Sequence, residues 1–299
     1  MKPIIIVAGG TGNLGSKIIR NLVEMGATVR AIVRIDTTPE KLSQLEGVGA
    51  NVLAIDMMDV QQVSNACKDA QCVVSALAGL EDVVLKLQKV LLDGAVLAGV
   101  PRFIPSDYSL DFTKFSPGEN RNLDWRRTFH TYLDAAPIQS TSIFNGAFAD
   151  LLKGEMPMIL AKQKWILYWG KSEHKMAFTT INDTAMYTAF VAMDNNTPRY
   201  LTIAGNLLSP KDVCDIVREI TGQKFKLFRA GGLKILSTLI IIARKLAGGE
   251  NKLYPPWQGM QYMRNMIDDR ALVHHLDNDR YPKMKWTSVK SMLIQHFKK

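Results

Sequence analysis

The chain has 299 residues, of which 47% are hydrophobic and 22% are charged. These proportions exclude an intrinsically disordered chain, a collagen-like repeat and a coiled-coil rod, and they predict a sizeable core in about two domains. The 37 Lys and Arg residues exceed the 28 Asp and Glu residues, and the net charge of +9 favours anionic partners without identifying them.

The cysteines and the apolar segments indicate the compartment. Three irregularly spaced cysteines and the lack of a C-x-x-C pair exclude a disulfide framework and a zinc or thiol-redox site of that type. The apolar run 4–8 is too short for a secretory signal, and residues 235–243 are too few to cross a bilayer. We therefore expect a cytoplasmic protein without a membrane partner. Neither a metal-ligand cluster nor a nucleic-acid reading element is recognisable.

Short β-branched runs alternate with segments of helical periodicity through the first half of the chain. The runs cover residues 4–8, 28–33, 51–55, 72–76 and 102–105. Runs this uniformly apolar suit strands that are buried on both faces, as in a parallel sheet with helices above and below. The first half is therefore predicted to be a doubly wound, Rossmann-type α/β fold.

A glycine-rich loop follows the first predicted strand and opens a helix predicted over residues 13–25. The loop satisfies both G-x-x-G-x-x-G and G-x-G-x-x-G between Gly9 and Gly15. Glycine permits a tight turn, lets the backbone approach a pyrophosphate, and leaves the N–H groups of the helix free for the anion. The loop thus predicts a dinucleotide site with contacts from Gly9, Thr11, Gly12, Asn13, Leu14 and Gly15.

Arg34 ends the second predicted strand, where the choice between the two pyridine dinucleotides is usually made. A guanidinium matches a 2′-phosphate, so Arg34 favours NADP(H) over NAD(H), with at least about tenfold tighter binding of NADPH than NADH. Asp36 is an alternative, as the acceptor for a ribose hydroxyl. Lys41 is either a second cation near the phosphate or an exposed lysine at a helix start.

The second half loses the strand and helix alternation from about Gly205 onward. Before that point, apolar periodicity over residues 83–97 predicts a helix, which ends at residues 99–101. After it, Ser209, Pro210 and Asp212 predict a helix N-terminus, and Gly222 predicts the end of that helix. We expect a Rossmann domain over residues 1–150, to which residues 176–205 return, and a smaller lobe over residues 206–299 with contributions from residues 151–175.

Several segments of the chain resemble the NmrA-like group of atypical short-chain dehydrogenases/reductases, which includes the isoflavone reductase-like enzymes. They are the glycine loop with Arg34 and residues 98–106, 145–148, 168–170 and 282–286, and the resemblance extends over most of the chain. It implies an NADP-binding Rossmann domain and a smaller substrate-binding lobe, with the nicotinamide between them. It also implies cofactor contacts at Ser75, Ala76, Leu77, Asn145 and Phe148.

The usual proton donors of both enzyme groups are missing from this sequence. The single Tyr-x-x-x-Lys spacing, Tyr281 to Lys285, contains Pro282, which argues against the helical geometry that this pair requires. Isoflavone reductase-like enzymes resemble one another in a lysine shortly before an Arg-Arg pair, and the matching residues 121–127 contain no lysine.

Three residues are candidates to replace the missing donor. Tyr108 follows the fifth predicted strand, at the sheet edge where ligands bind, although it is equally open to a packing role. Ser106 is either a hydrogen-bond donor to substrate or the cap of a local turn. His130 is either an acid or, more commonly for such a residue, a surface histidine. An aromatic and methionine cluster in the second lobe is either a pocket wall or plain core, and its members are Trp257, Met260, Tyr262, Met263 and Met266.

Two functional hypotheses follow from these features. The first is an NADPH-dependent reductase that transfers a hydride to a small or medium, partly apolar carbonyl or enone substrate. The alternative is a non-catalytic NADP(H)-binding redox sensor that acts through a protein partner, and the missing lysine favours it. The sequence specifies neither the substrate nor the oligomeric state.

Overall fold

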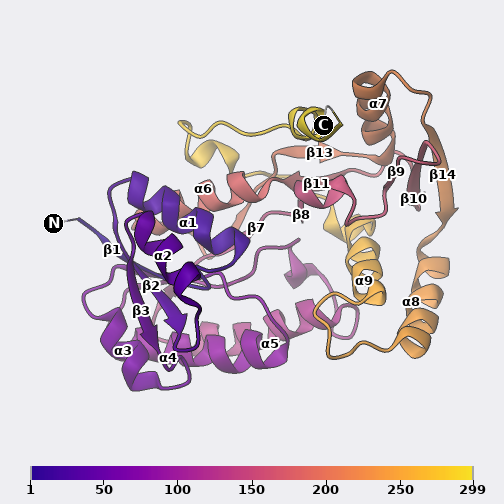
Figure 1. Ribbon diagram of the computed structural model, residues 1–299. Coiled ribbons are helices and arrows are strands. Elements are labelled where there is room, and N and C mark those ends of the chain that lie inside the picture. Colours follow the sequence, from indigo (N-terminus) through magenta and orange to yellow (C-terminus); the bar gives the residue numbers. More distant parts are fainter. Residues whose placement is uncertain (1, 298–299) are drawn as a thin grey trace. The chain divides into compact units, whose positions relative to one another are not determined.

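A parallel sheet with the strand order β3-β2-β1-β4-β5-β6 is formed by the first half of the chain (Figure 1). The computed structural model describes residues 2–297. The strands are β1 (Ile4–Ala8), β2 (Thr28–Arg34), β3 (Asn51–Ile55), β4 (Cys72–Ser75), β5 (Arg102–Ile104) and β6 (Gln139–Ser140). The order reverses between β1 and β4, which confirms the doubly wound, Rossmann-type prediction.

Helices cover both faces of this sheet. They are α1 (Asn13–Glu24), α2 (Pro39–Gly47), α3 (Val60–Cys67), α4 (Gln88–Leu97), α5 (Arg121–Ala135) and α6 (Ile181–Met193). Residues of α3, α4 and α5 share a core with the sheet on one face, and α1 and α6 lie on the other (Figure 1). The strands read as continuous apolar runs because both of their faces are covered, and residues 5–8 of β1 are fully buried.

The helix predicted after Leu80 is present, and it begins as a π-helix. Residues of the segment η1 (Asp82–Leu87) are π-helical, and α4 begins only at Gln88. The backbone N–H of Gln88 bonds to the carbonyl of Val83, while its side-chain amide donates to the carbonyl of Val84 at 3.2 Å. The predicted helix is therefore confirmed, and its first turns are π-helical, with the side chain of Gln88 bonding to a backbone carbonyl in that turn.

The described chain divides into two compact units. The first contains residues 2–108, 125–143 and 184–201, and the second contains residues 109–124, 144–183 and 202–297. The sequence analysis assigned residues 109–124, 144–150, 176–183 and 202–205 to the first domain instead. The difference has a physical cause, because Phe112, Phe115 and Phe144 are buried in the core of the second unit.

The second unit contains two small sheets, with the strand orders β14-β10-β9 and β13-β11-β8. Their strands are β8 (Ala147–Phe148), β9 (Ile159–Leu160), β10 (Trp165–Trp169), β11 (Met176–Thr179), β13 (Asn206–Leu208) and β14 (Lys226–Gly231). The helices are α7 (Pro210–Thr221), α8 (Leu233–Ala247), α9 (Pro256–Met266) and α10 (Val289–Phe297), and β7 (Ser142–Phe144) pairs with β12 (Tyr200–Thr202). Short 3₁₀ turns are η2 (Phe112–Lys114), η3 (Ala149–Lys153), η4 (Asp269–Ala271) and η5 (Asn278–Arg280).

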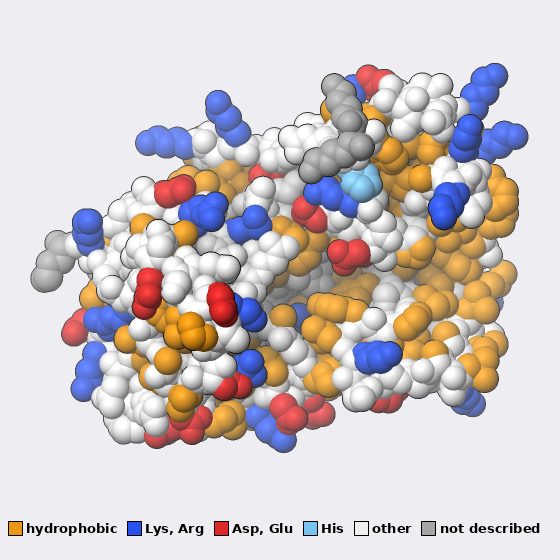
Figure 2. All heavy atoms as spheres, viewed as in Figure 1, with side chains coloured by type: hydrophobic (Ala, Val, Ile, Leu, Met, Phe, Trp, Pro, Cys, Tyr) orange, Lys and Arg blue, Asp and Glu red, His pale blue; other side chains and the backbone are white. Residues whose placement is uncertain are grey.

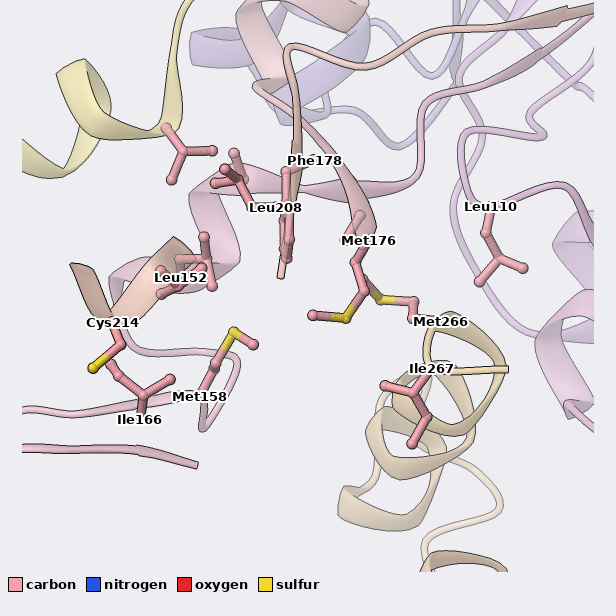
Figure 3. Close-up of a cluster of buried hydrophobic side chains, with 14 of the residues drawn as sticks. Leu110, Leu152, Met158, Ile166, Met176, Phe178, Leu208, Cys214, Met266 and Ile267 are labelled. Atoms are coloured by element: carbon pink, nitrogen blue, oxygen red, sulfur yellow. The ribbon is translucent and has the colours of Figure 1, made fainter. Parts of the chain in front are cut away.

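Side chains from these sheets and helices form the core of the second unit. Figure 3 shows Met158, Ile166, Phe178 and Leu208 from the strands and their connections, with Cys214 of α7 beside them. The predicted start of α7 is confirmed, because Ser209 and Asp212 form a reciprocal capping box, and the helix ends at Gly222 in the left-handed conformation. Within residues 2–297, no helix combines the length and the apolar content needed to span a bilayer.

Candidate functional site

The loop between β1 and α1 is shaped by close approaches that only glycine allows. Gly9 has a φ of +84°, and a Cβ atom there would lie 2.5 Å from the carbonyl oxygen of Ala76. A Cβ atom at Gly15 would lie 2.2 Å from the carbonyl oxygen of Gly9. Since real Cβ atoms do not come so near, the loop can pass this close to β4 and to the first turn of α1 only with glycine at both positions.

The N-terminus of α1 forms one wall of this glycine loop. Gly12 is the N-cap, no side chain caps the helix, and the first turn contains no acidic residue. Thr11, Gly12 and Asn13 are exposed, whereas Gly15 is buried. The backbone N–H groups of the first turn and the positive end of the helix dipole are therefore directed at a position that an anion can occupy.

Arg34 extends from the end of β2 into solvent, as the predicted contact to a 2′-phosphate requires. Its side chain is 72% exposed, and its Nε atom lies 3.5 Å from a carboxylate oxygen of Asp36. An exposed pair of this kind contributes at most about 1 kcal/mol, so Arg34 can exchange Asp36 for a phosphate at little cost. Lys41 is exposed in the first turn of α2. Asp36 remains the alternative, as the acceptor for a ribose hydroxyl.

The ends of β4 and β5 are tied together by Gln88, a residue that the sequence analysis did not single out. Its Oε1 atom accepts from the hydroxyl of Ser75 at 2.6 Å and from the backbone N–H of Ser106 at 2.9 Å. The hydroxyl of Ser106 donates to the carbonyl of Leu77 at 2.6 Å. These bonds fix the segment that contains Ser75, Ala76 and Leu77, and they use the only proton of each serine hydroxyl.

A buried polar network lies directly after Ser106. The Nε2 atom of His130 is 2.6 Å from Oδ2 of Asp107, and the hydroxyl of Ser142 donates to the same oxygen at 2.7 Å. Burial alone raises the pKa of Asp107, but the charge and hydrogen bond of His130, with Ser142, lower it below its ordinary value. Arg199 donates to Ser142 at 2.6 Å. His130 is therefore a buried partner of Asp107, and its interpretation as a surface residue is wrong.

Tyr108 is buried in the first unit. Its hydroxyl has no hydrogen bond of good geometry within residues 2–297. Burial raises the pKa of Tyr108 well above its ordinary value, and the nearby hydroxyl of Thr188 offsets only part of that rise. A short-chain dehydrogenase activates its tyrosine with a lysine that lowers this pKa, and the environment of Tyr108 does the opposite.

In the second unit, Asn145 is held with an unsatisfied side chain. Both polar atoms of its amide are buried and have no hydrogen-bond partner in the described part of the chain. Its backbone carbonyl accepts from the hydroxyl of Thr179 at 2.7 Å, and a Cβ atom on the next residue, Gly146, would lie 2.3 Å from the carbonyl oxygen of Ala177. The backbone is thus fixed, while the amide is left to bond to a ligand or water. Phe148, in β8, is partly buried.

A small pocket of about 30 Å³ adjoins this segment. Gly146 and Phe144 contribute to its lining, together with Leu110, Lys114, Met176 and Met266. Met176 and Met266 lie next to each other, and Leu110 lies across from them (Figure 3). Lys114 is a titratable cation in this lining, with its Nζ atom 3.6 Å from Oδ2 of Asp111. The sequence analysis missed Lys114 because it looked for a lysine only in the helix that follows.

The methionine and aromatic cluster of α9 is mostly core. Trp257 is fully buried, donates to the carbonyl of Gly248 at 2.7 Å, and is flanked by the guanidinium groups of Arg121 and Arg244. Met260, Tyr262 and Met263 pack against the core of the second unit, and of the five predicted residues Met266 lines the small pocket.

A second pocket of about 620 Å³ lies between α8 and α9, lined by Ile240, Ile241, Arg244, Lys245, Gln261 and Arg264.

Comparisons with known proteins agree with this architecture. The family model described as "NmrA-like family" matches residues 1–263. The chain is 28% identical to "Isoflavone reductase homolog IRL" from Zea mays over 241 residues, which cover 75% of this chain and 76% of the maize protein. It is 26% identical over 320 residues to "Pinoresinol reductase 1" from Arabidopsis thaliana, which covers 98% of this chain and 96% of that protein.

Solved structures show the same fold at lower sequence identity. The structure described as "AtPrR2 with NADP+ and (+)pinoresinol" is similar with a TM-score of 0.83 and 21% identity, and the match covers 99% of both chains. A crystal structure of an isoflavone reductase gives a TM-score of 0.83 at 19% identity, again over 99% of both chains. These likenesses confirm the Rossmann-type fold.

Proposed function

The chain belongs to the NmrA-like family, and on that premise we propose that it is an NADPH-dependent reductase. Its substrate is a small or medium, partly apolar molecule with a carbonyl, an enone or a similar electrophilic group. The relatives with printed activities are reductases, and similar structures contain NADP+ or NADPH. The observation that carries the proposal is the glycine loop, in which Gly9 and Gly15 approach neighbouring backbone too closely for any side chain while the uncapped N-terminus of α1 is exposed.

The residues present fit NADP(H). Backbone N–H groups from Asn13 to Gly15 receive the diphosphate, and the exposed Arg34 binds the 2′-phosphate. Segment 75–77, fixed by Gln88, offers its backbone to the cofactor. The unsatisfied amide of Asn145 supplies a donor and an acceptor to the ligand. Lys41 adds a second cation near the 2′-phosphate.

NADPH supplies the hydride, so the chain needs to orient the substrate, exclude water and deliver one proton. We assign the proton to the ammonium group of Lys114. It lines the pocket beside Gly146 together with Asp111, and lysine is one of the residue types that act as general acids. The hydroxyl of Ser106 is already donated to Leu77. Tyr108, buried and with a raised pKa, stays the second candidate.

A redox sensor is the rival function, and one observation favours it. The three donors expected from the sequence are each buried, and Ser106 and His130 are bonded within the chain. A protein that binds NADP(H) and transmits its redox state to a partner has no use for a free donor. Turnover therefore separates the two functions more clearly than binding does.

The test is the oxidation of NADPH, followed by its absorbance, over a panel of ketones, enones and aryl ethers that includes pinoresinol. The reductase proposal expects substrate-dependent oxidation with at least one member, at a rate that Lys114→Met lowers. No oxidation with any member, combined with a partner protein whose binding depends on the NADP+ to NADPH ratio, would establish the sensor instead.

A further inference from the structure

An exposed apolar surface covers β14 and α8 in the second unit. Ile235, Leu239, Ile242 and Leu246 follow one another at intervals of four, three and four residues, so they form a single stripe along α8. Leu236 and Ile240 face the core instead. The stripe is open to solvent, with Leu246 83% exposed and Ile242 46% exposed. Soluble proteins seldom leave such a stripe uncovered.

The strand that precedes α8 continues this surface. Along β14, Phe228 is exposed, and the strand forms the edge of its sheet, paired with β10. Trp165 of β10 stacks on Phe228 with their ring centroids 4.6 Å apart, and it too is exposed. Figure 2 shows hydrophobic atoms gathered over both β14 and α8 along one side of the molecule. We call the six residues Trp165, Phe228, Ile235, Leu239, Ile242 and Leu246 the apolar strip.

The segment that carries most of the apolar strip is basic. No acidic residue occurs between Glu219 and Glu250, whereas six cations do: Lys224, Lys226, Arg229, Lys234, Arg244 and Lys245. Arg244 is paired with Glu250. Two more lysines, Lys162 and Lys164, precede Trp165, and the carbonyl of Lys164 accepts from the N–H of Lys226 at 2.9 Å. An apolar stripe with a basic border is the pattern of a helix that lies in a membrane interface.

We propose that the apolar strip binds the surface of an anionic lipid bilayer. The strip is inserted at the level of the headgroups, and the bordering lysines pair with lipid phosphates and carboxylates. Trp165 and Phe228 suit that depth, because aromatic rings favour the membrane–water interface. With 15 residues, α8 is about 22 Å long and lies along the surface, so the binding needs no spanning segment. The sequence argument against a membrane partner concerned only such a segment.

Charge favours the bilayer over a second copy of the chain. A two-fold interface brings the same patch of each copy together, so it would bring the basic residues of both copies, Lys234 and Lys245 among them, into one interface. The stretch between Glu219 and Glu250 offers no carboxylate to compensate them. An anionic headgroup layer complements both the stripe and its border.

Sedimentation with lipid vesicles tests the proposal on the full-length protein. Vesicles of phosphatidylcholine alone are compared with vesicles that contain phosphatidylserine as well, at low and at high salt. We expect at least tenfold stronger partitioning into the anionic vesicles at low salt, and a loss of that preference at high salt. The variant Ile242→Glu/Leu246→Glu is expected to lower partitioning at least tenfold. Lys234→Gln/Lys245→Gln removes two cations and is expected to lower it about thirtyfold.

The matched control is Met58→Glu/Leu97→Glu, which changes two exposed apolar residues in the first unit. It should partition like the unchanged protein, and circular dichroism should show that all variants are folded. Equal binding to neutral and anionic vesicles, or no binding to either, would overturn the proposal. A dimer in sedimentation velocity that Ile242→Glu/Leu246→Glu dissociates, without vesicle binding by the unchanged protein, would assign the strip to a second copy.

Discussion

A Cβ atom on Gly15 would lie 2.2 Å from the carbonyl oxygen of Gly9, so the first turn of α1 and the end of β1 meet at a distance that only hydrogen allows. The N–H of Gly12 also bonds to that carbonyl, at 3.1 Å. The loop is consequently held in one shape, and we propose that the remaining N–H groups of the first turn of α1 bind the diphosphate. Because of this shape, one methyl group added at Gly15 is enough to test the cofactor proposal.

Gly15→Ala is expected to weaken NADPH binding at least tenfold, because the methyl group forces α1 away from the loop and moves the N–H groups off the diphosphate. Isothermal titration calorimetry measures the change. Gly47→Ala is the matched control, since a Cβ atom there meets nothing within 4 Å. Unchanged affinity in Gly15→Ala would mean that the diphosphate binds elsewhere.

Arg34→Gln should weaken NADPH binding about tenfold or more and leave NADH binding unchanged, because only NADPH carries the phosphate that the guanidinium pairs with. Asp36→Asn tests the alternative. If the carboxylate of Asp36 accepts a hydrogen bond from the ribose, this variant lowers NADH binding instead. Dissociation constants for both nucleotides, measured by fluorescence titration on the two variants, decide between them. A loss of NADH affinity in Asp36→Asn with no effect in Arg34→Gln would contradict the NADP(H) assignment.

Lys114→Met should lower kcat about a hundredfold at unchanged NADPH affinity, which is the loss expected when a general acid is removed. Tyr108→Phe is the paired variant, since it removes only a hydroxyl that is buried without a good hydrogen bond. Steady-state rates of both variants identify the donor. The reverse result, a hundredfold loss in Tyr108→Phe and normal turnover in Lys114→Met, would make Tyr108 the donor.

Glu119→Gln should destabilise the protein by about 1 to 2 kcal/mol at pH 7. The carboxylate of Glu119 is bonded by Arg270 at 2.8 and 2.9 Å and by Arg264 at 2.5 Å, and the pairing with Arg270 lowers the pKa of Glu119 to about 2. A lowered folded-state pKa contributes stability above the unfolded value of 4.5, and this is lost as the pH falls from 4.5 toward 2.

Urea unfolding of Glu119→Gln and the unchanged protein at pH 7 and pH 3 checks this dependence on pH. The difference between the two proteins should be smaller at pH 3. Glu155→Gln, which alters an exposed carboxylate, controls for the loss of a surface charge. A difference of equal size at both pH values would show that the stabilisation does not depend on the ionised carboxylate.

The sheet and the glycine loop could be predicted because their determinants are local. Residues 4–8 and 51–55 are strands as predicted, since an uninterrupted apolar run suits a strand buried on both faces. The capping box at Ser209 and the end of its helix at Gly222 also depend on neighbours in the sequence alone. The glycine spacing reflects one steric contact, the close approach of Gly15 to the carbonyl of Gly9, and these two residues lie within seven positions of the sequence.

The remainder depends on long-range contacts that one sequence does not reveal. Gln88 connects Ser75 with Ser106 across two strands, and nothing near Gln88 in the sequence marks it as a link. His130 looks like an exposed helical residue until Asp107, 23 positions earlier, is placed beside it. Lys114 lies in a pocket whose other walls come from β7, β11 and α9. The division into two units likewise follows from the burial of Phe112 and Phe144 in a shared core.

The most direct test of the central claim is a calorimetric titration of the unchanged protein with NADPH and, separately, with NADH. The account predicts one site per chain and at least about tenfold tighter binding of NADPH. Absence of binding for both nucleotides, or an equal or higher affinity for NADH, would contradict it.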